Sequence, residues 1–61
     1  MAQITDKELE VIEDELTDEQ TIIAKMKAYS QMCADQELKE KCDAIVQKHQ
    51  THFNRLMGLL G

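Results

Sequence analysis

The six residues CADQEL, numbered 33 to 38, lie between two long stretches of helix-forming residues. Asp35 is a favourable N-cap, because its carboxylate can accept a hydrogen bond from a free backbone N–H at the start of a helix. Glu37 adds a negative charge to the first turn, where the helix dipole favours it. We therefore expect one helix to end near Cys33 and a second to begin at residue 36. So short a connection makes the two helices antiparallel neighbours.

The start of the first helix is marked by a capping box. The Thr5 hydroxyl can accept the free N–H of Glu8 while the Glu8 side chain reaches back to the backbone of Thr5. Residues 17–20 (TDEQ) repeat this pattern. Two alternatives follow: a short or kinked segment 5–16 before a helix 17–33, or one continuous helix.

The second helix is predicted over residues 36–58, with Gly58 and Gly61 marking its end. The chain has 61 residues, no proline and no other glycine, so it lacks the turn residues that a β-barrel or sandwich needs. Straight-chain helix formers dominate its composition. The sequence therefore predicts a single all-α domain over residues 1–61.

Apolar residues recur at alternating steps of three and four in both helices, as in the seams of helix bundles. The seam of the first helix consists of Leu9, Ile12, Leu16, Glu19, Ile23, Met26, Ser30 and Cys33. The seam of the second consists of Leu38, Cys42, Ile45, His49, His52, Leu56 and Leu59, flanked by Val46, Phe53 and Leu60. Ser30 is expected to bond a carbonyl one turn back. A chain below about 70–80 residues rarely buries enough apolar area alone. We therefore expect the hairpin to dimerise into a four-helix bundle.

Besides Ser30, three polar residues lie on these seams: Glu19, His49 and His52. A buried charge must be paired, neutralised or bound to a metal. With the turn centred near Asp35, Glu19 is level with position 51, within about 3 Å of both histidines along the axis. Imidazole suits transition metals, so the three residues are a candidate site for a transition metal such as Zn or Fe. The alternative is a hydrogen-bonded core in which Glu19 is the structural partner of one histidine.

Over residues 4–60 the chain is similar to ferritin-like four-helix proteins, and to the small coat F-type spore coat proteins of endospore-forming bacteria. The residues that carry the resemblance are Leu16 to Gln20, Tyr29, Cys33, Asp35 to Leu38 and Lys48 to Phe53. The resemblance implies a ferritin-like fold in which Glu19 matches the carboxylate of the first helix and His52 the histidine of an E-x-x-H pair. His49 departs from that pattern, which has Glu at this position. The departure weakens a carboxylate-bridged di-iron interpretation.

Charge and cysteine usage narrow the class of protein further. Seven Lys and Arg against twelve Asp and Glu give a net charge of −5, which argues against nucleic acid or an anionic membrane as a partner. The chain has neither a secretory signal nor a run of about 20 apolar residues, so we expect an intracellular protein. Cys33 and Cys42 are expected to stay reduced, because their predicted axial offset of about 7–8 Å exceeds the usual disulfide Cα separation.

We therefore expect a small structural or interaction protein, a homodimeric bundle resembling spore coat proteins, with other coat proteins as partners and the spore coat as its location. The alternative is a transition-metal-binding, ferritin-like protein with a redox role. No phosphate loop or nucleophile motif is present, so we assign no catalytic residue and lean towards a role other than enzyme. Copper storage by methionine and cysteine is less favoured, because Met26 lies on the seam and is expected to pack in the hydrophobic core.

Overall fold

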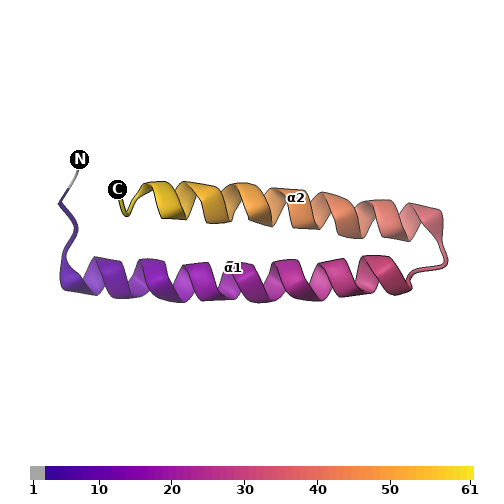
Figure 1. Cartoon of the computed structure of the whole chain (residues 1–61), viewed down its shortest axis with the longest axis horizontal. Helices are drawn as coiled ribbons and strands as arrows, with labels where there is room; N and C mark the ends of the chain where they lie inside the picture. Colours follow the sequence, from indigo (N-terminus) through magenta and orange to yellow (C-terminus); the bar gives the residue numbers. More distant parts are fainter. Residues whose placement is uncertain (1–2) are drawn as a thin grey trace.

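A computed structural model describes residues 3–61 and shows two α-helices, α1 (Asp6–Met32) and α2 (Gln36–Gly58), joined by residues 33–35. The helices run antiparallel, so the end of α2 lies beside the start of α1, and the loop lies at the opposite end of the hairpin (Figure 1). The predicted all-α hairpin is confirmed, and the described residues contain no strand. Neither helix has a stretch long and apolar enough to cross a lipid bilayer.

Both helices begin at the predicted caps. The Thr5 hydroxyl accepts the N–H of Glu8 at 3.0 Å, and Glu8 Oε1 accepts the N–H of Thr5 at 3.0 Å, which completes the capping box. The hydrogen bond from the Thr5 backbone N–H, with a smaller effect of the Thr5 side chain, holds the pKa of the Glu8 carboxyl below its ordinary value. At the second cap, Asp35 Oδ1 accepts the N–H of Leu38 at 3.1 Å. The capping residues therefore set where α1 and α2 start.

α1 is one continuous helix, which decides between the two alternatives left open by the sequence. Thr17, the residue that opens the second capping pattern, donates its hydroxyl to the Glu13 carbonyl one turn back, at 3.1 Å. Thr21 bonds the Thr17 carbonyl in the same way, at 3.0 Å. Because the Thr17 side chain points towards the preceding turn, it caps no new helix and α1 runs through Leu16 without a break.

The predicted seam of α1 is confirmed, since each of its eight residues is buried or half-buried. In α2 the prediction is partly wrong. Val46 is buried, at 8% exposure, whereas Leu38 and Ile45 are 52% and 37% exposed. The prediction treated two neighbouring stripes of α2 as one seam. The stripe that faces α1 contains Cys42, Val46, His49, Phe53 and Leu56. The other repeats every seven residues along one edge and is called here the outer stripe: Leu38, Ile45, His52 and Leu59.

Ser30 also behaves differently from the expectation. Its hydroxyl donates to Asp43 Oδ1 on α2 at 2.5 Å instead of to a carbonyl one turn back. Ser30 is buried, at 5% exposure, and a charged acceptor forms a stronger bond than a neutral carbonyl. The bond joins the two helices near the loop and helps to set their register.

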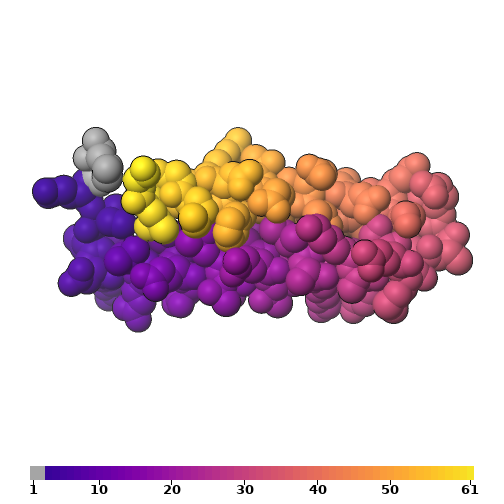
Figure 2. Space-filling view, viewed as in Figure 1, coloured from indigo at the N-terminus to yellow at the C-terminus, as the bar shows by residue number. Residues whose placement is uncertain are grey.

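The hairpin is a single layer with dimensions of 46 × 16 × 10 Å, and the two helices pack side by side along their length (Figures 1 and 2). Its radius of gyration is 14.4 Å, against about 10.5 Å for a compact domain of this length. Its accessible surface is 4877 Å², against about 4,000 Å² for a compact monomer of this mass. No side chain among the described residues is fully buried. The hairpin therefore buries little apolar surface between its two helices.

Candidate metal centre

The hairpin brings Glu19, His49 and His52 together at its middle. Glu19 is the central residue of α1, thirteen residues from each end. His49 and His52 are three residues apart on α2, a spacing that directs both side chains to one side of the helix. The register worked out from the short loop, with Glu19 level with a point between the two histidines, is thus confirmed by their contacts.

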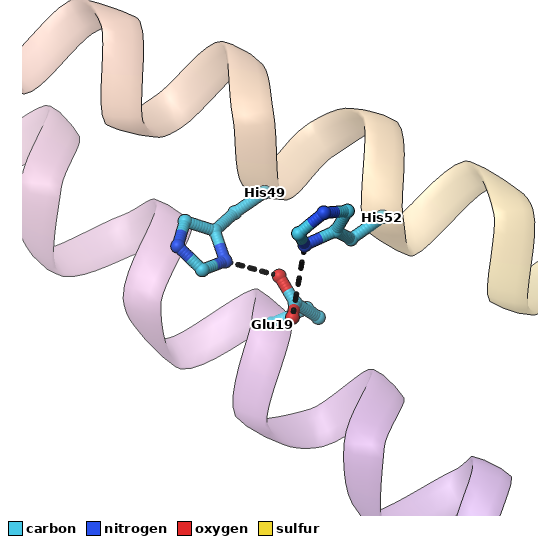
Figure 3. A group of neighbouring side chains, drawn as sticks. All are labelled: Glu19, His49 and His52. Atoms are coloured by element: carbon cyan, nitrogen blue, oxygen red, sulfur yellow. Dashed lines mark hydrogen bonds and ion pairs between the residues drawn. The ribbon is translucent and has the colours of Figure 1, made fainter.

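Both imidazoles turn their Nδ1 atoms towards the Glu19 carboxylate, one to each oxygen (Figure 3). The distance from His49 Nδ1 to Glu19 Oε2 is 2.6 Å, a short hydrogen bond. The distance from His52 Nδ1 to Glu19 Oε1 is 3.8 Å, too long for a hydrogen bond. The two rings meet edge to face, with centroids 5.5 Å apart and an interplanar angle of 84°. Glu19 is therefore shared unequally, and His52 is the less constrained partner.

Burial decreases across the cluster from the carboxylate outwards. The side chain of Glu19 is 11% exposed, that of His49 23% and that of His52 41%. In the His49 tautomer with its proton on Nδ1, this nitrogen donates to the Glu19 carboxylate and the Nε2 lone pair remains free. No buried polar side-chain atom of the described residues lacks a partner. The hydrogen bond to His49 therefore satisfies the buried Glu19 carboxylate without a metal ion.

The same three side chains are able to hold a metal ion. One ligand atom from each lies within 4.8 Å of the others. Two ligands of one tetrahedral zinc ion, each about 2.0–2.2 Å from it, are separated by about 3.3–3.6 Å. The cluster must therefore contract by about 1 Å, which rotation of the half-exposed His52 side chain can supply. A metal at His49 Nδ1 would replace the hydrogen bond between His49 and Glu19.

Two neighbours of the cluster escaped the sequence-based reasoning. Glu15 and Arg55 line a hollow of about 250 Å³ together with Glu19, His52 and Leu56. Glu15 lies one helical turn before Glu19 on the same side of α1, so the i, i+4 spacing of the two carboxylates was a usable signal. Glu15 places a further carboxylate beside His52, and Arg55 adds a positive charge to the same hollow.

No protein-family model, no curated protein and no solved structure matches this chain. The resemblance to ferritin-like and spore coat proteins therefore stays a hypothesis that rests on the residues quoted for it.

Proposed function

We propose that this protein is a homodimeric four-helix bundle that binds a transition-metal ion between its two copies of the Glu19, His49 and His52 cluster. The observation that carries the proposal is the convergence of one carboxylate and two imidazoles, from two helices, within 4.8 Å at the middle of the hairpin. Ferritin-like bundles also build their metal sites from side chains on facing helices of the core.

Accessible surface area supports the dimer. The hairpin exposes about 800–900 Å² more than a compact monomer of its mass would expose. A standard interface buries about 800 Å² on each partner. The excess surface is therefore about the area that one hairpin would bury against a second copy.

The distribution of apolar side chains indicates which face the second copy covers. The outer stripe lies beside apolar residues of α1, because Leu38 shares one hollow with Tyr29 and Leu59 shares another with Val11. This face, which also carries His52, is called here the apolar face. A two-fold axis through its middle brings the two clusters into one layer, since Glu19 is the central residue of α1. The second copy then supplies the ligands that one cluster lacks.

The donor set favours particular metals. Two clusters together offer two carboxylates and four imidazoles, and imidazole suits Zn, Cu, Fe and Ni, whereas Mg and Ca prefer oxygen ligands. His49 stands where a ferritin-like pair has Glu, so the centre is richer in nitrogen than a carboxylate-bridged di-iron site. We propose zinc or iron as the resident ion.

The second candidate function is structural, as in a spore coat protein that assembles with its neighbours. The 2.6 Å bond between Glu19 and His49 favours it, because that bond satisfies the buried carboxylate without any ion. In this alternative the bundle has the same dimeric core, and the histidines only hold its register. The two candidate functions differ in whether His52 binds a metal ion.

Calorimetric titration of the chelator-treated protein at pH 7.5 distinguishes the two candidates. Zn²⁺, Ni²⁺ and anaerobic Fe²⁺ are titrated against Mg²⁺ and Ca²⁺ into the wild type, His52→Ala and the control Gln47→Ala, which changes an exposed residue of α2. We expect heat from at least one transition metal with the wild type and the control, none from Mg²⁺ or Ca²⁺, and none with His52→Ala. Absence of heat from all three transition metals with the wild type would leave the structural role.

A further inference from the structure

A second group of metal-binding side chains lies at the loop end of the hairpin. Cys33 caps the C-terminus of α1, and Cys42 lies on α2 nine residues further along the chain, so the antiparallel fold returns it to the same end. A hollow of about 410 Å³ there is lined by Met26, Tyr29, Met32, Cys33, Leu38 and Cys42. Four of its six lining side chains thus contain sulfur.

Both thiols are free, and both line this hollow. Cys42 is 5% exposed and Cys33 is half-buried.

The lining also excludes the harder metal ions. It contains neither a carboxylate nor an imidazole, so an ion that prefers those two ligand types finds neither in the lining. Thiolate sulfur suits Cu(I), Zn and Fe–S clusters, and the thioether sulfur beside it favours Cu(I) among them. Cu(I) accepts low coordination numbers, so two thiolates and one thioether suffice.

We propose that this hollow is a binding site for Cu(I), with Cys33 and Cys42 as thiolate ligands and the thioether of Met26 as a further ligand. Each thiol transfers its proton to solvent as its S–Cu bond forms, and copper arrives and stays in the +1 state, so no oxidant or reductant is consumed. Met32 is 76% exposed and lies at the mouth of the hollow, where it can meet the arriving ion.

This site is independent of the Glu19, His49 and His52 cluster. Cys42 and His49 are seven residues apart on α2, which corresponds to about 10 Å along the helix axis. The two sites also differ in chemistry, one of sulfur and one of nitrogen and oxygen. Loss of one site is therefore expected to leave the other intact.

Competition against a coloured chelator tests the proposal. Under anaerobic, reducing-agent-free conditions, reduced protein is mixed with the Cu(I) complex of bathocuproine disulfonate, and loss of the colour reports transfer of copper. We expect the wild type to take about one Cu(I) per chain, with sulfur as the ligand in X-ray absorption spectra. Cys33→Ser and Cys42→Ser should each lose the transfer. Because Cys33 lies in the loop, its variant is expected to keep the fold, which circular dichroism verifies.

Matched variants make the result specific. Met26→Leu should weaken retention of copper at high chelator concentration, whereas Met57→Leu, at the other end of α2 and outside the hollow, should not. His52→Ala should show no heat when transition metals are added in the calorimetric titration described above, and it should still take up Cu(I) from the chelator. The proposal is overturned if the wild type leaves all copper with the chelator, or if folded Cys33→Ser takes up copper as the wild type does.

Discussion

Replacement of Ile45 by glutamate separates a free hairpin from a dimer. Ile45 belongs to the outer stripe and is 37% exposed in the single hairpin. In a hairpin that works alone, a glutamate at this position reaches water, and such surface changes usually alter stability by no more than about 0.5 kcal/mol. In the dimer, two copies of Ile45 lie in the interface, and the substitution buries two like charges.

The expected magnitude follows from the exposed fraction. Complete burial of an isoleucine stabilises by about 1.5–3 kcal/mol, so covering the remaining third contributes about 0.5–1 kcal/mol per copy. Glutamate loses this contribution in both copies, and desolvating its charge costs several kcal/mol more. Since about 1.4 kcal/mol corresponds to a factor of ten, the dissociation constant of the dimer should rise at least about a hundredfold.

Sedimentation velocity and circular dichroism at micromolar concentration measure the effect, with Gln47→Glu as the control. Gln47 is exposed on the same helix, and its variant adds the same charge. We expect the control to remain a helical dimer and Ile45→Glu to dissociate and lose helicity, because a lone hairpin buries little apolar surface between its two helices. If both variants sediment and melt alike, the apolar face is not an interface.

Further outcomes follow from individual contacts. Ile23→Glu should unfold the protein. Ile23 faces the other helix at 9% exposure, so a glutamate at this position would bury its charge away from water. Zinc at a hundredfold excess over its dissociation constant should stabilise the wild type by about 2.7 kcal/mol in thermal melts, and His52→Ala should remove this gain. His49→Glu should shift the preference among metals in calorimetry towards iron. The pKa of Glu8 is lowered in the folded state, so its stabilising effect is present above the unfolded pKa and is lost as the pH falls through the folded pKa. Glu8→Gln should therefore lose less stability on acidification than the wild type in denaturant titrations.

Much of the fold could be predicted from local chemistry. The caps at Thr5 and Asp35 need only nearby residues to act, and the short loop then set the register that brought Glu19 to the two histidines. In α1 the periodicity was sufficient, because every residue of the predicted seam is buried or half-buried.

Other features depended on contacts that a single sequence does not reveal. In α2 two apolar stripes lie side by side, and spacing alone could not say that Val46 faces α1 while Ile45 lies on the outer stripe. The bond of Ser30 was missed because its partner, Asp43, is on the other helix. The second capping pattern left two alternatives open, because the sequence did not show that Thr17 would bond the carbonyl one turn back.

Native mass spectrometry of the zinc-loaded protein tests the central claim most directly, because it reports assembly and metal content together. The chain has a mass of 7.0 kDa. We predict a species of twice this mass that carries zinc, and a His52→Ala dimer of the same size without zinc. A metal-free species of 7.0 kDa from the zinc-treated wild type would contradict the account.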